Sequence, residues 1–196
     1  MPGEVLTPRL EIRPWQPDDI DRLAEIFAKP EVWHFPFGRG FTREESEAFL
    51  ARGLEHRGWD TPFPQAAVER ATGTLIGYIT LSVPDYLPEV MPALEIGWRL
   101  DPPYQGRGLA TEGARRVLEY GFCDMSLPEI LSIYEPDNVA SGRVMEKIGM
   151  RFARETIHPY FGRTLRIYRL TRTDWDAGRS HGGLDAGGGA APGPRR

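Results

Sequence analysis

The sequence predicts an α+β fold, a mixed sheet of about seven strands with about four helices on its faces. The order of hydrophobic patterns indicates this fold class, because runs of strand-like alternation stand beside separated segments of helical spacing. The length agrees, since 196 residues suffice for one domain with a substantial core and fall short of two. The composition, with 40% hydrophobic and 27% charged residues, is ordinary for a globular chain.

Strands are expected where apolar and polar residues alternate or β-branched residues gather: residues 9–15, 65–71, 74–84, 92–100, 129–136, and a closing hairpin of 151–160 and 163–172. Helices are expected where apolar residues recur every three or four positions: residues 17–29, 42–55, 106–123 and 138–148. Thr42 followed by Glu45 is a capping-box pattern, and Asn138 is a favourable N-cap. Gly149 stands where a left-handed residue ends a helix. Residues 31–41 have no clean period and are interpreted as a loop.

Charge and composition exclude several classes of protein. A formal net charge of −4 argues against a duplex nucleic-acid binder, which is usually basic. No apolar run approaches the roughly 20 residues that span a bilayer, and the N-terminus lacks a secretory pattern. We therefore expect a cytoplasmic protein without a membrane partner. Residues 177–196 are rich in Gly, Ala and Pro, which predicts a disordered tail after a domain of residues 1–176.

A glycine-containing turn follows the strand expected over 92–100. The stretch "DPPYQGRGLATEG" places Gly106 and Gly108 at the start of a helix. A helix start carries about four backbone N–H groups without partners and the positive end of the macrodipole. Glycines remove the Cβ atoms that would hold an anion at a distance, so the segment predicts a diphosphate site. Arg107 and Thr111 are expected to add side-chain donors.

Local spacing alone leaves the ligand of this turn open. A P-loop would need a lysine followed by Ser or Thr after the second glycine, whereas this chain has Leu109 and Ala110. A dinucleotide fold would place its glycines directly after the strand, and here "DPPYQ" intervenes. A plain glycine-rich turn without any ligand also satisfies the pattern.

The wider sequence resembles the GNAT N-acetyltransferase superfamily. "QGRGLA" after "EIGWRLDPPY" is similar to its acetyl-coenzyme A motif, and "TPRLEIRPW", "TGTLIGYITL", "PDNVASGRVMEKIGM" and "LRIYRLTRTDW" extend the likeness over roughly residues 7–176. The resemblance points to the branch that contains the ribosomal-protein-alanine acetyltransferases. It implies a strongly twisted sheet whose fourth and fifth strands splay apart.

The resemblance also implies which residues bind the cofactor, acetyl-coenzyme A. The pantetheine arm is expected to pair with the open edge of the strand over 92–100, because edge amides are otherwise unpaired. The residues expected to contact the cofactor are Trp98, Arg99, Leu100, Gln105, Gly106, Arg107, Gly108, Leu109, Ala110, Thr111, Asn138 and Ser141.

Two residues are expected to carry the chemistry of amine acetylation. Glu95 alternates away from Leu94 and Ile96, toward the side where substrate could enter, which favours it as a water-mediated base. A solvent-facing glutamate would give the same alternation. The resemblance places Ser141 near the thioester sulfur and implies a tyrosine acid at the position of Met145, which cannot donate a proton. Ser141, or a water that it holds, is therefore the candidate acid.

The remaining candidates are weaker. The four histidines show no metal-ligand spacing, so no metal is expected. Cys123 is the single cysteine, so it cannot form an intrachain disulfide. It is expected on the apolar side of the helix, as a core residue rather than as a nucleophile. Tyr104 is expected to cover the glycine turn, and Tyr160 to border the substrate groove. The aromatic stretch over 33–37 is interpreted either as a substrate wall or as a surface plug.

The resemblance thus implies transfer of an acetyl group from acetyl-coenzyme A to a primary amine, and we expect direct transfer because the sequence shows no activated nucleophile. The expected acceptor is the α-amine of a protein or peptide N-terminus. An acetyltransferase of a small-molecule amine and a non-catalytic sensor of acyl-coenzyme A are the alternatives, and the missing tyrosine at Met145 favours the sensor. A nicotinamide oxidoreductase that uses the glycine turn is a further alternative. The chain is expected to be a monomer or a homodimer.

Overall fold

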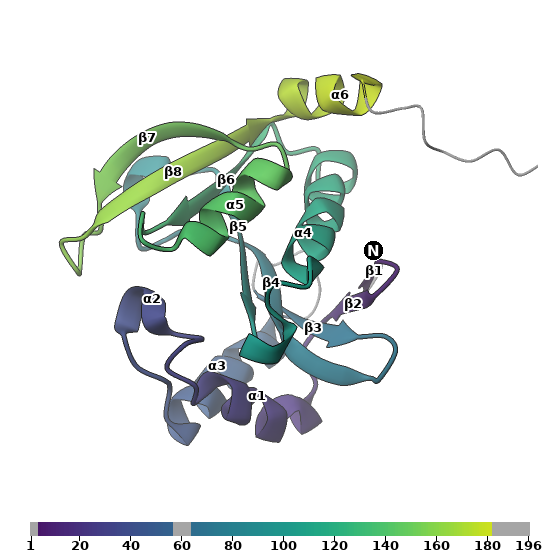
Figure 1. The fold of residues 1–196 in the computed structure, drawn as a ribbon, viewed down its shortest axis with the longest axis vertical. Coiled ribbons are helices and arrows are strands. Elements are labelled where there is room, and N and C mark those ends of the chain that lie inside the picture. Colours follow the sequence, from purple (N-terminus) through teal and green to yellow (C-terminus); the bar gives the residue numbers. More distant parts are fainter. Residues whose placement is uncertain (1–3, 57–63, 182–196) are drawn as a thin grey trace, which may run out of the picture.

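The protein folds around one open sheet of eight strands (Figure 1). The computed structural model describes residues 4–56 and 64–181. The strands are β1 (Val5–Leu6), β2 (Leu10–Arg13), β3 (Gln65–Glu69), β4 (Thr74–Ser82), β5 (Leu94–Leu100), β6 (Glu129–Tyr134), β7 (Arg151–Ile157) and β8 (Thr164–Thr171), in the order β1-β2-β3-β4-β5-β6-β8-β7. The short β1 is the strand that alternation did not predict. All pairings are antiparallel except that of β5 with β6, so the predicted mixed sheet is confirmed.

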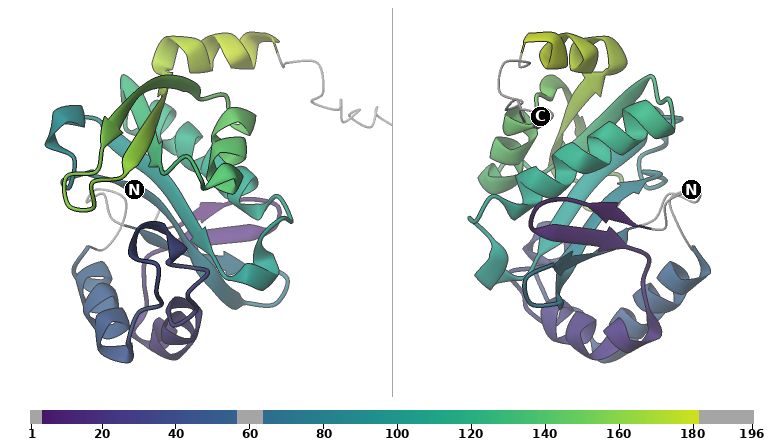
Figure 2. Two further views of the ribbon diagram at one scale, coloured as in Figure 1. Left: turned by 60° about the vertical axis from the view of Figure 1, so that its left-hand side comes forward. Right: turned by 90° about the vertical axis from the view of Figure 1, so that its right-hand side faces the viewer.

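Helices cover both faces of this sheet. They are α1 (Ile20–Phe27), α2 (His34–Phe37), α3 (Arg43–Glu55), α4 (Leu109–Glu119), α5 (Val139–Lys147) and α6 (Arg172–His181). One hydrophobic core joins α4 and α5 to the sheet, and a second core joins α1 and α3 to the opposite face. Neighbouring residues divide between these cores, since Leu75 packs with α1 and α3 whereas Ile76 packs with α4. Figure 2 shows α4 crossing the strands obliquely. None of the described helices is long and apolar enough to cross a membrane.

Local sequence signals account for several helix ends. The Thr42 side chain accepts the N–H of Glu45 at 3.2 Å, and the Glu45 carboxylate accepts the N–H of Thr42 at 2.8 Å, which is the predicted capping box. Asn138 caps α5 as predicted, and Gly149 follows this helix with φ +88°. The expected loop over 31–41 contains the short helix α2.

Two expectations about the helices are corrected. Regular α-helix ends at Glu119 and continues as a π-helical turn over Tyr120–Asp124. This wider turn shifts the helical phase, and Cys123 is exposed rather than in the core. The expected tail from residue 177 was wrong at its start, because α6 runs from Arg172 to His181. Trp175 packs its ring 5.2 Å from that of Phe122 and thereby holds this helix against the domain. Residues 182–196 lie outside the described part of the chain.

The parallel pairing of β5 with β6 is very short. It joins Leu94 to Ile130 and Glu95 to Leu131 and then ends. Beyond this point the Ser132 hydroxyl donates to the Ile96 carbonyl at 2.8 Å, so a side chain rather than backbone spans the widening gap. β5 continues toward α1, whereas β6 ends beside α5 (Figure 1). This is the splay that the resemblance predicted.

An ion cluster fixes the far end of β5. Asp101, which is 1% exposed, follows this strand and binds two cations from the first helical region. The Arg22 guanidinium donates to Asp101 Oδ2, and Lys29 Nζ lies 2.6 Å from Asp101 Oδ1. The cluster therefore fixes α1 relative to the turn that precedes α4.

Asp101→Asn should destabilise the fold, because it removes the buried anion that compensates Arg22 and Lys29. Both cations are partly exposed, so we expect a loss on the order of 2 kcal/mol in the free energy of unfolding, measured by urea denaturation. Asp21→Asn is the control, since Asp21 binds Arg43 at 2.8 Å on the surface, and a change below about 0.5 kcal/mol is expected. Equal losses in the two variants would show that the buried cluster has no special role.

Candidate active site

Two cavities meet at the point where β5 and β6 separate. The first, of about 730 Å³, runs along the glycine turn and the start of α4, and we call it the turn groove. The second, of about 490 Å³, is walled by aromatic side chains, and we call it the aromatic cavity. Both are lined by Phe35, Trp98, Arg99, Asn138 and Ser141. A ligand in the turn groove can therefore reach into the aromatic cavity.

The turn groove contains an uncapped helix start. Gly106 and Gly108 have φ values of +70° and +78°, which glycine adopts without strain. Gly108 is the N-cap of α4, and no side chain of the described residues caps the first turn. A Cβ on Gly106 would meet no described atom within 4 Å, so the backbone faces open space. The first-turn N–H groups and the positive end of α4 thus form a site suited to an anion.

The structure brings most of the predicted cofactor-contacting residues together in this groove. Those that line it are Trp98, Arg99, Leu100, Gln105, Gly106, Gly108, Leu109, Ala110, Thr111, Asn138 and Ser141. Arg107 is the exception, because its guanidinium binds Glu69 at 3.0 Å and lies over the Tyr104 ring. The side-chain donor expected at Arg107 stays a prediction, since this half-exposed guanidinium binds Glu69 on the surface. The Gln105 side chain donates to the Leu100 carbonyl at 2.8 Å and so occupies one acceptor of the open strand edge.

Two basic residues of α5, Arg143 and Lys147, also line the turn groove. Sequence reasoning missed them, although their spacing of four residues places them on one side of a helix. They face the same groove as the start of α4, so two helices contribute positive charge to it. The groove is therefore suited to a ligand with more than one anionic group.

Glu95 lies in the wall of the aromatic cavity, between the buried residues Leu94 and Ile96. The predicted alternation is therefore confirmed. The Tyr86 hydroxyl donates to Glu95 Oε2 at 3.1 Å. Burial raises the pKa of Glu95 to about 7, although the Tyr86 hydroxyl, the Ile133 N–H and the charge of Arg99 oppose the shift. A carboxyl with this pKa can take up or release a proton near neutral pH.

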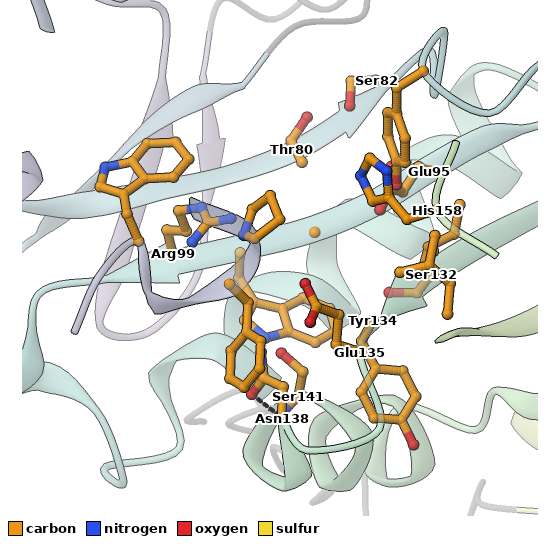
Figure 3. Close-up of a pocket in the computed structure, with 18 of the residues that line it drawn as sticks. Thr80, Ser82, Glu95, Arg99, Ser132, Tyr134, Glu135, Asn138, Ser141 and His158 are labelled. Carbon is orange, nitrogen blue, oxygen red and sulfur yellow. Dashed lines mark hydrogen bonds between the residues drawn. The ribbon is translucent and has the colours of Figure 1, made fainter. Parts of the chain in front are cut away.

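Asn138 and Ser141 stand side by side at the start of α5 (Figure 3). Asn138 Oδ1 accepts the N–H of Ser141 at 3.3 Å, so its side chain already caps the helix. Met145 is buried and also lines the aromatic cavity, so a thioether stands at the position where the resemblance implies a tyrosine. Ser141 is the hydroxyl that α5 presents to both cavities.

Aromatic rings close the outer side of the aromatic cavity. Phe37 of α2 lies 5.8 Å from Phe161 at the tip of the β7–β8 hairpin, ring centre to ring centre. Arg163 on the same hairpin donates to the Pro36 carbonyl. Both rings line the cavity, as do Trp33, Phe35 and Tyr160. The aromatic stretch over 33–37 is therefore a cavity wall, and Tyr160 lies at its border as predicted.

Sequence reasoning missed two titratable groups of this cavity, His158 and Glu135. His158 stacks on Tyr86 with 5.5 Å between ring centres, and its Nδ1 accepts the N–H of Tyr160 at 3.2 Å. Burial and the nearby Arg163 lower the pKa of His158, which favours the neutral ring. Glu135 is 7% exposed and lies directly after β6. Neither residue stands in a local motif, so only the folded chain places them here.

A GNAT acetyltransferase domain matches residues 9–151. The chain belongs to the GNAT acetyltransferase family. It is 35% identical over 147 residues to an uncharacterised N-acetyltransferase, YnaD, of Bacillus subtilis, a match that covers 75% of this chain and 82% of the relative. As a member of this family, the protein is an acetyl-coenzyme A-dependent N-acetyltransferase.

Solved structures agree with this assignment. A GNAT-family acetyltransferase from Bacillus anthracis superposes with a TM-score of 0.74 at 26% identity, covering 87% of this chain and 99% of that one. The ribosomal L7/L12 α-N-protein acetyltransferase RimL, solved in complex with coenzyme A, superposes with a TM-score of 0.69 at 14% identity over 86% and 97% of the two chains. The second likeness shows a shared GNAT fold.

The raised pKa of Glu95 predicts a pH-dependent stability. The carboxyl is protonated more readily in the folded chain, with a pKa of about 7, than at its ordinary value of 4.5. The folded chain therefore binds more protons between these values, and stability falls as pH rises through this window, by up to about 3 kcal/mol.

Glu95→Gln should remove this contribution. The difference in unfolding free energy between Glu95→Gln and the original protein should grow in favour of the variant from pH 5 to pH 8, measured by urea denaturation. A constant difference across this range would show that the Glu95 pKa is not raised.

Proposed function

We propose that the protein transfers an acetyl group from acetyl-coenzyme A directly to a primary amine, with the α-amine of a protein or peptide N-terminus as the acceptor. The observation that carries this proposal is the meeting of the two cavities at Trp98, Asn138 and Ser141. One cavity offers an anion site at a helix start, and the other offers a carboxyl that titrates near neutrality. Those are the two features that amine acetylation by a phosphorylated thioester requires.

The residues of the turn groove fit acetyl-coenzyme A, which supplies an activated acetyl thioester when bound. The N–H groups of Leu109, Ala110 and Thr111 at the start of α4 would hold the diphosphate. Arg143 and Lys147 would bind further phosphate charge from the α5 side. The edge of β5 at Trp98 and Arg99, which β6 leaves uncovered, would pair with the amides of the pantetheine arm.

Glu95 would accept the proton of the acceptor amine, directly or through a water. An α-amine has a pKa near 7.7–8 and a lysine side chain near 10.4. Transfer of that proton to a carboxyl of pKa about 7 costs about 1 kcal/mol for the α-amine and roughly 4–5 kcal/mol for lysine. This difference supports an α-amine, or another amine of similar basicity, as the acceptor.

Ser141 would donate a hydrogen bond to the departing sulfur, because Met145 carries no proton to give. Direct transfer is supported by the linings of the two cavities, which contain no cysteine among the described residues. Cys123 lies on the surface, in the π-helical turn after α4. An acyl-enzyme would need an activated nucleophile. The Ser141 backbone N–H donates to Asn138 Oδ1. Among the described contacts, no basic side chain binds the Ser141 hydroxyl.

The test of the function is thiol release from acetyl-coenzyme A in the presence of amines and peptides, with the mass of each product measured. Transfer to an amine should rise with pH through about 7, since Glu95 must be ionised to act as base. Glu95→Gln should lower kcat by about 100-fold and flatten this rise.

Three results would contradict parts of the proposal. Tight cofactor binding without thiol release from any amine would identify a sensor of acyl-coenzyme A. Acetylation confined to small amines would exclude the peptide acceptor. An unchanged pH profile in Glu95→Gln would remove Glu95 from the role of base.

Gly106→Ala should weaken the binding of coenzyme A, because the added methyl group enters the open space over the helix start. We expect a loss of about tenfold in affinity, measured by calorimetry, since at least one charged hydrogen bond is weakened. Gly73→Ala is the matched control, because Gly73 has a φ of +69°, one degree from that of Gly106, equally open surroundings and no place in the groove. Equal affinities in the two variants would place the cofactor elsewhere.

A further inference from the structure

Glu135 carries a carboxylate whose two oxygens differ in their surroundings. It follows β6, and its carbonyl accepts the N–H of Asn138 at 2.8 Å in the turn that leads into α5. Glu135 Oε2 lies 3.0 Å from Arg163 on the β7–β8 hairpin. Glu135 Oε1 is buried and has no hydrogen-bond partner in the described part of the chain. A buried acceptor without a partner is unfavourable, so such an atom calls for a ligand or a water.

The Glu135 carboxylate lies beside the place where the reaction would occur. Glu135 lines the aromatic cavity together with Asn138 and Ser141, the two residues that also line the turn groove. Figure 3 shows its carboxylate above Ser141 and directed into the cavity, with Glu95 on the far side. Both carboxylates therefore border the space that the acceptor would occupy.

The other charges of the cavity are already committed. The Arg99 guanidinium donates to the Tyr78 hydroxyl at 3.0 Å and to the Val32 carbonyl, and lies 3.9 Å from the centre of the Trp33 ring. Burial lowers the pKa of His158, which favours its uncharged form. Among the described residues that line the cavity, no cation is left to satisfy Glu135 Oε1. The Glu135 carboxylate thus keeps one oxygen without a partner inside aromatic walls.

We propose that Glu135 is a positioning residue whose Oε1 binds the ammonium form of the acceptor amine beside Ser141, before Glu95 removes the proton. This inference rests on the proposed function. Arg163 holds the other oxygen and so fixes the direction of the carboxylate. The aromatic walls would pack against the apolar group that carries the amine and can stabilise the cation through their ring faces. The acceptor class is then a primary ammonium attached to an apolar or aromatic group.

The binding of a charged probe and of an uncharged probe separates the positioning role of Glu135 from catalysis. 2-Phenylethylamine and 2-phenylethanol have the same ring and chain and differ in the terminal group. Calorimetry at neutral pH, with coenzyme A present, should show tighter binding of the amine than of the alcohol to the original protein. Glu135→Gln should reduce this preference by about 10- to 100-fold, the value of one charge-assisted hydrogen bond.

Three further variants control the measurement. Glu155→Gln removes a carboxylate that binds Arg166 at 2.9 Å on the same hairpin but outside the cavity, and should leave the preference unchanged. Glu135→Asp keeps the charge and should retain part of the preference. Glu95→Gln should keep it as well, because Glu95 acts after binding. Thermal denaturation of each variant shows whether it is folded.

The kinetic signature distinguishes positioning from proton removal. Glu135→Gln should raise KM for the amine acceptor by about tenfold or more and change kcat by less than about threefold. Its pH profile should keep the midpoint of the original protein. An amine preference that survives in Glu135→Gln overturns the proposal, as does loss of the rise in rate with pH in this variant. Failure of both probes to bind at millimolar concentration also overturns it, whereas failure of the proposed function would appear as absent thiol release.

Discussion

The early end of the pairing between β5 and β6 is the constraint on which the site depends. Only Leu94 and Glu95 pair with β6, and the strands then follow different directions. Continuous pairing would fill the space between them with backbone hydrogen bonds and would cover the edge at Trp98 and Arg99. The gap admits α5 to one side and the aromatic segments to the other. Both cavities therefore exist because the strands stop pairing while the sheet continues through β4 and β8.

The gap also separates the two carboxylates that line the aromatic cavity. Glu95 is the last residue of β5 that pairs with β6, and its partner is Leu131. Glu135 follows Leu131 by four residues. Four residues of strand cover roughly 13 Å, so the carboxylates approach the cavity from different levels. Burial acts on both, raising the pKa of each. Tyr86 binds one carboxylate and Arg163 the other, so the two groups are held apart by their partners.

Local patterns in the sequence predicted much of the fold but only part of the site. The capping box of Thr42, the N-cap of Asn138 and the alternation around Glu95 depend on neighbours within a few residues, and the structure confirms them. Glu135 and His158 could not be found in this way, because they come to line the same cavity as Glu95 only after distant strands pair. The exposure of Cys123 depends on a π-helical turn that a period of 3.6 residues does not reveal. The glycine-rich composition predicted a tail where α6 continues, and this helix packs on the domain through the ring of Trp175.

The contact between α2 and the β7–β8 hairpin has a consequence for how such an enzyme diversifies. Phe37 and Arg163 belong to two connecting segments that touch above the aromatic cavity but do not contribute to the sheet. Connecting segments tolerate replacement better than strands do. Changes in these two segments can therefore reshape this border of the aromatic cavity while the turn before α4 stays intact. Relatives that keep the same turn before α4 can in this way differ in the acceptors that they use.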